Sequence, residues 1–146
     1  MQSLREGGML VAKIHQVSGR IFAKKLKEHN INEINPAQGR ILFVLWKNDG
    51  IPISQLSEKT LLKKSTLTSM LDRLEEMGYI IRIPSENDRR KVIIKRTDKD
   101  RSFQILYIQV SREMNDLFYK GFTEKEIDQL ESSLERILDN LTKYDR

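Results

Sequence analysis

Apolar residues recur with the helical period in six separate stretches of this chain. In the first stretch, Leu10, Ile14, Val17 and Ile21 follow one another at helical spacing and form a continuous stripe. Because such a stripe has to be covered by another element, each stretch predicts an amphipathic helix. The predicted helices cover about residues 9–28, 36–47, 54–61, 64–77, 98–119 and 124–143. The fifth is expected to line one side with Phe103, Leu106, Val110, Met114 and Leu117.

Residues that start or stop helices stand at the borders of these stretches. Asn35 before Pro36 predicts a capped start for the second helix, and Ser54 is expected to cap the third. Capping boxes are predicted where a threonine precedes an acidic residue by three positions. These boxes are Thr97 with Asp100 and Thr123 with Glu126, and the glycine ends are Gly78 and Gly121.

Two β-branched runs between the fourth and fifth helices predict a β-hairpin. One run covers residues 80–83 and the other residues 92–94, and the loop between them, PSENDRRK, ends in three cations. A short strand at residues 51–53 is expected to pair with this hairpin. The predicted fold class is therefore mainly α (α+β), a winged helix-turn-helix with N- and C-terminal dimerisation helices.

The fourth predicted helix carries short hydroxyls and cations opposite its apolar face. Hydroxyls can approach base edges or phosphates, and an arginine can bind guanine through two hydrogen bonds, so this face predicts DNA contact. The alternatives are that some of these side chains only solvate the helix and that Arg73 pairs with Glu75 or Glu76. With the loop cations included, the DNA-binding candidates are Lys63, Lys64, Ser65, Thr66, Thr68, Ser69, Arg73, Arg89, Arg90 and Lys91.

The distribution of charge supports a polyanionic partner. The 146 residues carry a formal net charge of +5. Residues 51–101 hold twelve Lys and Arg against eight Asp and Glu, whereas residues 102–146 hold six against nine. A basic winged-helix region in a chain with an acidic C-terminal region suits double-stranded DNA.

Several classes of function find no support in the sequence. The chain has no cysteine, which excludes a thiol redox sensor. Its two histidines are too few for a metal cluster, so neither metal nor cofactor is expected. It lacks a Gly-rich phosphate loop, a nucleophile elbow and an HExxH motif, and it is not expected to be an enzyme. No apolar run approaches the roughly 20 residues of a membrane span, and no signal-peptide core is visible, so the expected location is the cytoplasm.

The first, fifth and sixth helices are not needed to complete a winged helix. Their stripes are better covered by a second copy of the chain, and a twofold homodimer is the commonest solution. The alternative is a monomer in which these helices pack on each other. The dimer contacts are expected mainly from Leu10, Ile14, Leu134 and Leu141. The expected domains are an N-terminal dimerisation helix at 1–35, a winged helix-turn-helix DNA-binding domain at 36–97 and C-terminal dimerisation helices at 98–146.

Two segments resemble the MarR family of bacterial and archaeal transcriptional regulators. They are the run LTSMLDRLEEMGYI, residues 67–80, and Asp88-Arg89-Arg90 leading to VIIKRT. The resemblance covers nearly the whole chain, because the flanking helices match in length and order. It implies that Arg90 reaches the minor groove, and Asp88 is expected to orient a neighbouring arginine. Ser69 stands where several relatives carry a base-contacting arginine.

The resemblance also implies a crevice for a ligand, since many relatives bind small aromatic acids between the dimerisation helices and the DNA-binding lobe. Lys13 or Arg40 could pair a carboxylate there, and Tyr107 could stack or hydrogen-bond. The alternative is that these are ordinary surface or interface residues. The full set of ligand-binding candidates is Lys13, His15, Gln16, Arg40 and Tyr107.

Together, these features predict a homodimeric transcriptional regulator that binds a pseudo-palindromic operator and acts as a repressor by occlusion. A small aromatic or anionic ligand is the expected signal for release. The alternative function is a winged-helix module that binds another protein and not specific DNA. A protein-binding module is expected to replace the cations and hydroxyls between Lys63 and Arg73 with apolar or acidic residues, and this chain does not.

Overall fold

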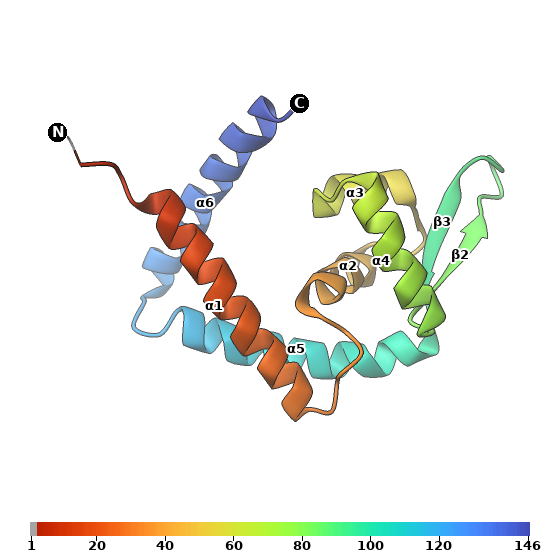
Figure 1. Cartoon of the computed structure of the whole chain (residues 1–146), viewed down its shortest axis with the longest axis horizontal. Coiled ribbons are helices and arrows are strands. Elements are labelled where there is room, and N and C mark those ends of the chain that lie inside the picture. The colour runs from red at the N-terminus through yellow and green to blue at the C-terminus, as the bar shows by residue number, and fades with distance from the viewer. Residues whose placement is uncertain (1–2) are drawn as a thin grey trace. The chain divides into compact units, whose positions relative to one another are not determined.

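The computed structural model describes residues 3–146, which contain six helices and a small antiparallel sheet (Figure 1). The elements are α1 (Gly7–Glu28), α2 (Pro36–Lys47), β1 (Ile51–Pro52), α3 (Ile53–Thr60), α4 (Lys64–Glu76), β2 (Ile80–Pro84), β3 (Val92–Arg96), α5 (Asp98–Phe118) and α6 (Glu124–Tyr144). This confirms the mainly α winged helix-turn-helix. The chain divides into two compact units, one ending at Ser111 and one covering Arg112–Arg146. None of the helices within residues 3–146 has the length and apolar character that a membrane span requires.

Helices α2, α3 and α4 form the helix-turn-helix around an apolar core. Leu42, Leu56 and Leu71, one from each helix, are fully buried. The start of α2 is capped by a contact between nearby residues, as predicted. The Asn35 side chain accepts a hydrogen bond from the Gln38 amide at 2.8 Å. The Gln38 side chain in turn accepts one from the Asn35 amide at 3.0 Å. The core therefore holds α4 with its apolar face inward.

Helix α3 starts differently from the prediction. It begins at Ile53 with Pro52 as its N-cap, and no side chain caps it, so the expected cap at Ser54 is wrong. The reason is that β1 runs straight into the helix: Pro52 has φ −63° and ψ 150°, which suit both the end of a strand and the residue before a helix. At the other end Leu61 takes the left-handed conformation, with φ 59°.

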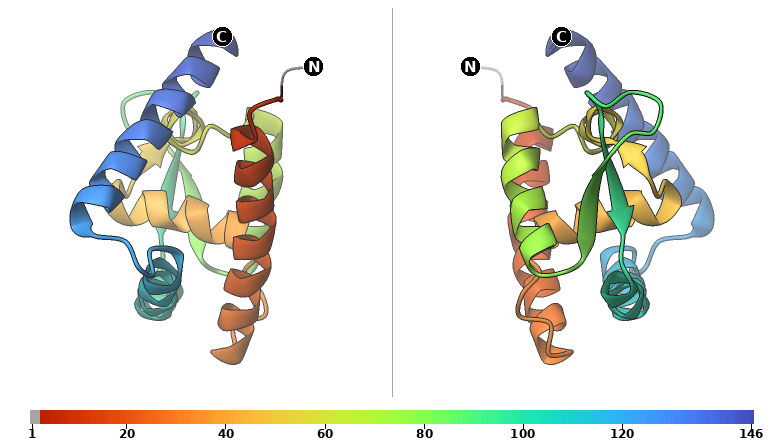
Figure 2. Two further views of the ribbon diagram at one scale, coloured as in Figure 1. Left: turned by 90° about the vertical axis from the view of Figure 1, so that its left-hand side faces the viewer. Right: turned by 90° about the vertical axis from the view of Figure 1, so that its right-hand side faces the viewer.

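Gly78 ends α4 and turns the chain into the hairpin. It has a φ of 85°, and its amide donates to the Glu75 carbonyl at 3.0 Å, while the Tyr79 amide donates to the Leu74 carbonyl at 2.9 Å. This is the bonding pattern of a Schellman end. Strands β2 and β3 then pair antiparallel, and β1 joins the other edge of β3 as predicted. The resulting wing, defined as residues 80–96, runs beside α4 (Figure 2).

The buried face of α5 is rotated from the predicted one. Phe103 and Val110 are buried as expected, but Asp100 and Tyr107 complete the face, and Leu106 is only half-buried. Aromatic packing against α2 accounts for this rotation, because the rings of Tyr107 and Trp46 lie 5.0 Å apart between centroids. The periodicity of the sequence was correct, but the centre of the face lies one residue further along the helix.

The capping box predicted at the start of α5 forms only in part. Thr97 Oγ1 accepts from the Asp100 amide at 3.4 Å, while the Thr97 hydroxyl donates to the Gly78 carbonyl at 2.6 Å. The Asp100 carboxylate turns away from the helix start and accepts hydrogen bonds from Trp46 and Arg96. Tertiary partners replace the local one because the side chain is fully buried.

Two helices leave apolar stripes exposed. On α1, Leu26 is buried, but the side chains of Leu10 and Ile14 are 52% and 47% exposed. On α6 no residue is buried, although the predicted capping box of Thr123 and Glu126 is complete and starts the helix. Local sequence therefore forms both helices without supplying a cover for their stripes.

Candidate nucleic-acid interface

Helix α4 presents the predicted polar face to solvent. Leu67 and Leu71 are fully buried on its other side, so the helical period directs the hydroxyls and cations outward. Thr68 is half-buried, and its hydroxyl donates to the Lys64 carbonyl at 2.8 Å. The exposed members of the predicted set on or next to this helix are Lys63, Lys64, Ser65, Thr66, Ser69 and Arg73.

The tip of the wing carries the predicted cations at the surface. Asp88 accepts hydrogen bonds from the Arg90 amide at 3.0 Å and from Arg90 Nε at 3.2 Å, which is the orienting role expected of this carboxylate. The hydrogen bond from the Arg90 amide, and then that from its side chain, lower the pKa of Asp88. The Arg90 side chain is 91% exposed. It is therefore oriented at its base and open to an external partner, as are Arg89 and Lys91.

Arg82 connects the wing to α4, and sequence reasoning missed it. Arg82 Nη1 lies 2.6 Å from Asp72 Oδ1 and Nη2 lies 2.8 Å from Glu75 Oε1, and the Arg82 amide also donates to Glu75 at 3.0 Å. The hydrogen bond from the Arg82 side chain lowers the pKa of Glu75. The available signal was a lone cation in the run IIRIP and two acids three residues apart on a helix. Glu75 is thus engaged by Arg82, and not by Arg73 as one alternative had it.

A cleft of about 460 Å³ lies between α4 and the wing. Lys64 and Thr68 line it from α4, and Arg90 and Lys91 line it from the wing. Its remaining lining residues are Pro52, Ile53, Ser54, Arg82 and Val92. The structure thus brings part of the helix set and part of the loop set to one cationic cleft, an arrangement that suits an anionic backbone.

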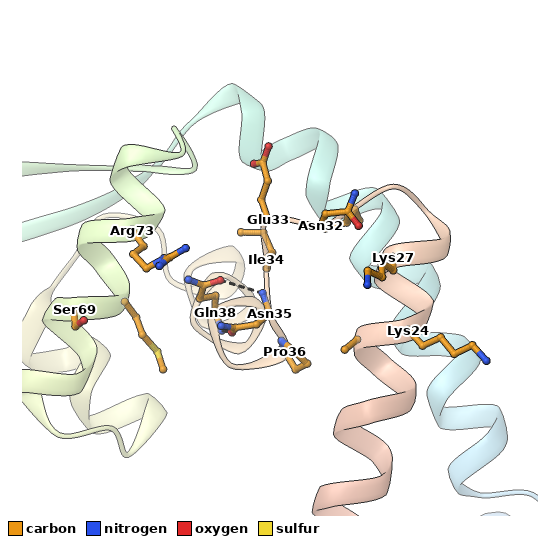
Figure 3. Close-up of a pocket in the computed structure, with 13 residues that line it drawn as sticks. Lys24, Lys27, Asn32, Glu33, Ile34, Asn35, Pro36, Gln38, Ser69 and Arg73 are labelled. Atoms are coloured by element: carbon orange, nitrogen blue, oxygen red, sulfur yellow. Dashed lines mark hydrogen bonds between the residues drawn. The ribbon is translucent and has the colours of Figure 1, made fainter.

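A larger pocket, of about 670 Å³, lies between α4 and the C-terminal part of α1 (Figure 3). Lys24 and Lys27 of α1 and Arg73 of α4 line it, with Glu33 as the acidic residue. Figure 3 shows Arg73 directed from α4 toward Gln38 at the start of α2. The other lining residues are Ala23, Ile31, Asn32, Ile34, Asn35, Pro36, Gln38, Ser69 and Met70. Arg73 and Ser69 therefore belong both to this pocket and to the predicted DNA face.

A model of the MarR family matches residues 34–92, from just before α2 to the start of β3. Residues 34–92, less than half of the chain, thus match the MarR family. The resemblance seen in the α4 run and in the wing is thereby confirmed.

Two curated relatives show how far the similarity extends along the chain. The transcriptional regulator TtmR of Methylorubrum extorquens (strain PA1) is 34% identical over 86 residues, which cover 59% of this chain and 43% of the relative. The transcriptional repressor IacR of Pseudomonas putida is 28% identical over 109 residues, covering 75% of this chain and 65% of the relative. The chain thus spans less than two thirds of the length of either relative. Both are named as regulators of transcription, in agreement with the expectation that this chain is not an enzyme.

A solved structure extends the likeness to nearly the whole chain. The crystal structure of a mutant MarR from E. coli complexed with operator DNA has a TM-score of 0.80 at 26% identity. The match covers 90% of this chain and 92% of that one. Because it reaches well beyond residues 34–92, it includes flanking helices as well as the winged helix.

The five residues predicted for ligand contact do not gather in the pockets described above. Lys13, His15 and Gln16 are exposed on α1, and Arg40 lines a separate pocket of about 230 Å³ between α2 and α3. Tyr107 is 6% exposed, and its burial raises the pKa of its hydroxyl. Contact between Tyr107 and a ligand would require the aromatic core to move, and the set of five stays a prediction.

Proposed function

We propose that this chain binds a pseudo-palindromic DNA operator as a homodimer and represses transcription by occupying it. The observation that carries the proposal is the cleft in which Lys64 and Thr68 of α4 meet Arg90 and Lys91 of the wing. Winged helices bind duplex DNA with a helix in the major groove and a basic hairpin beside it. The operator complex of the E. coli relative and the repressor name of the P. putida relative support this role. We propose the cytoplasm as its location, because binding requires access to the operator.

The homodimer in this proposal is supported by apolar side chains that the single chain leaves exposed. Leu10 and Ile14 on α1 are 52% and 47% exposed, and Leu134 and Leu141 on α6 are 39% and 64% exposed. Contiguous exposed apolar rows mark protein interfaces. A twofold dimer also spaces two recognition helices by about 34 Å, one turn of duplex DNA. We assign dimerisation to residues 1–35 and 98–146 and DNA binding to residues 36–97.

Selection of bound sites from randomised duplexes tests the DNA-binding proposal. We expect enrichment of an inverted repeat, with a Kd on the order of 10⁻⁸ M or tighter at physiological salt. Lys64→Ala combined with Arg90→Ala should weaken this binding, whereas the matched variant Lys125→Ala, an exposed cation at the start of α6, should not. If no sequence is enriched, and if the double variant binds DNA like the wild type just as Lys125→Ala does, the proposal is contradicted.

We further propose that a small aromatic or anionic ligand releases the protein from DNA. The pocket of about 670 Å³ supports this, because its volume is in the range of small-molecule sites and Lys24, Lys27 and Arg73 line it. An anion held by Arg73 would compete with DNA for the same guanidinium. Calorimetry of the DNA-free protein with salicylate-like acids should show binding that Lys24→Ala weakens. If no heat is measured, ligand release is contradicted, while the DNA-binding proposal stands.

A further inference from the structure

Asp100 is the one fully buried charged side chain among residues 3–146. Its carboxylate accepts a hydrogen bond from Trp46 Nε1, 2.8 Å from Oδ2 and 3.1 Å from Oδ1, and another from Arg96 Nε at 2.6 Å. Arg96 Nη2 also donates to Gln104 Oε1 at 2.5 Å. A buried carboxylate with two N–H partners is therefore present outside the proposed DNA face and outside the three pockets described above.

These partners join α2, the wing and α5. Trp46 belongs to α2, Arg96 is the last residue of β3, and Asp100 and Gln104 belong to α5. The Arg96 amide also donates to Asp49 Oδ1 at 2.9 Å, just after the end of α2. The root of the wing is thus fastened to α2 and α5 through both its main chain and its side chain.

The wing has a second anchor on its other strand. Arg82 of β2 pairs with Asp72 and Glu75 of α4 at 2.6 Å and 2.8 Å. One strand of the hairpin is therefore tied to the recognition helix and the other to α5. Arg90 lies at the tip, beyond both anchors, so its position depends on how they hold the two strands.

The contacts of Asp100 affect the geometry of the wing more than the stability of the fold. Burying a carboxylate is costly, and a buried ion pair returns little net stability over apolar side chains of similar size. The buried carboxylate instead fixes an orientation. Because the N–H groups of Trp46 and Arg96 both donate to it, the Arg96 side chain is restricted to one placement. We infer that Asp100 is a positioning residue for DNA binding, which holds the root of the wing at a set angle to α5 and thereby places Arg90 relative to α4.

The inference rests on the proposed function, but its first consequence can be measured without DNA. Trp46 is the single tryptophan of the chain, and its indole N–H donates to Asp100, so its emission reports on this contact. Hydrogen exchange of the wing amides reports on how firmly the hairpin is held. Both measurements use the full-length protein alone.

The decisive variant is Asp100→Asn, which keeps the size of the side chain and removes its charge. Asp98→Asn is the matched control, since Asp98 lies two residues earlier on α5 and its side chain is 95% exposed. We expect the amides of β2 and β3 to exchange about tenfold faster in Asp100→Asn, because a charge-assisted hydrogen bond is lost. The amides of α4 should be unchanged, the Trp46 emission should shift, and Asp98→Asn should match the wild type.

Two outcomes of the exchange measurement would overturn the inference. One is equal protection of the wing in wild type and Asp100→Asn. The other is a uniform loss of protection over the whole unit, because that would show a merely structural role. If Asp100→Asn does not fold, Gln104→Ala, which removes one acceptor of Arg96 and leaves Asp100 in place, undergoes the same measurement with the same criteria.

A double-mutant cycle with Arg90→Ala, on the duplex selected above, tests the link to DNA. If Asp100 acts through the wing, Asp100→Asn should weaken DNA binding about tenfold alone and much less in the Arg90→Ala background. Equal losses in both backgrounds would overturn the link. If the wild type binds no duplex, the proposed function fails, whereas the exchange measurement still decides whether Asp100 holds the wing.

Discussion

Helices α4 and α6 have the same spacing of apolar residues, but the apolar face is buried on α4 and exposed on α6. On α4, Leu67, Leu71 and Leu74 are all 0% exposed. On α6, Leu134 and Leu141 are 39% and 64% exposed. An apolar stripe therefore shows that a helix face has to be covered, but it does not show whether the same chain supplies the cover. For α4 the lobe does so, and for α6 we propose a second copy.

The polar faces of the two helices also differ in charge. The N-terminal half of the exposed face of α4 carries hydroxyls and cations and lies beside the basic tip of the wing, as Lys64 and Arg90 illustrate. Helix α6 has acidic residues in its first turn, Glu124 and Glu126, as suits the positive end of a helix dipole. This difference favours DNA at α4 and protein association at α6, and the two roles can be separated by substitution.

The same substitution on the two helices gives the largest contrast. Leu71→Asp buries an unpaired charge in the core of the lobe, which costs several kcal/mol against a total stability of about 5–15 kcal/mol. We expect the variant to be largely unfolded, as measured by circular dichroism and urea titration. A cooperative unfolding transition near that of the wild type would show that α4 is not part of the core.

Leu134→Asp should leave the chain folded and disrupt the dimer. The wild type is expected to sediment at about twice 17.2 kDa and the variant at about 17.2 kDa, because the charge now lies in the proposed interface. Ser133→Asp adds the same charge beside the stripe and should remain dimeric. A Leu134→Asp variant that stays dimeric would place the interface elsewhere.

Arg90→Ala should weaken operator binding by about 1–3 kcal/mol if Arg90 contacts a groove. The expectation rests on its 91% exposed side chain at the wing tip. Gel-shift or anisotropy titrations at one salt concentration measure the effect. An affinity equal to that of the wild type would remove Arg90 from the interface.

Lys64→Ala should weaken DNA binding less than Arg90→Ala does, and by a similar amount for every DNA sequence. If Lys64 contacts a phosphate, the slope of log K against log salt should fall in magnitude by about one. The same series on Lys125→Ala, at the start of α6, should reproduce the wild-type slope. A slope unaltered by Lys64→Ala would argue against a phosphate contact.

The smallest expected effect is a dependence of stability on pH at the junction of α4 and the wing. The hydrogen bond from Arg82 lowers the pKa of Glu75 below its ordinary value of 4.5. Glu75 therefore contributes stability above about pH 4.5, and this contribution is lost as the pH falls through the lowered pKa. The difference in unfolding free energy between wild type and Glu75→Gln should shrink on acidification. It should be smaller in an Arg82→Ala background, where only the main-chain amide of residue 82 still donates to Glu75.

Much of the candidate interface could be predicted, because helical periodicity alone directs the α4 residues outward. The loop cations were predicted from their place between two β-branched runs. Their meeting with Lys64 in one cleft, and the clamp that Arg82 forms with Asp72 and Glu75, depend on how the hairpin packs against α4. No pattern within either segment specifies that packing.

The sequence by itself determined the elements whose signals are local. The Asn35 cap with Pro36, the glycine end at Gly78 and the capping box of Thr123 with Glu126 involve partners only a few residues apart, so adjacent residues suffice to predict them.

Only the tertiary structure decided where side chains with distant partners lie. Trp46 and Asp100 are separated by 54 positions, yet their hydrogen bond draws Asp100 from the predicted capping box into the core. Tyr107, expected to contact a ligand, is buried because its ring packs against Trp46, with centroids 5.0 Å apart. The physical reason is the same in each case: a buried polar or aromatic side chain takes the partner that packing brings within reach, and the order of the residues does not state which one that is.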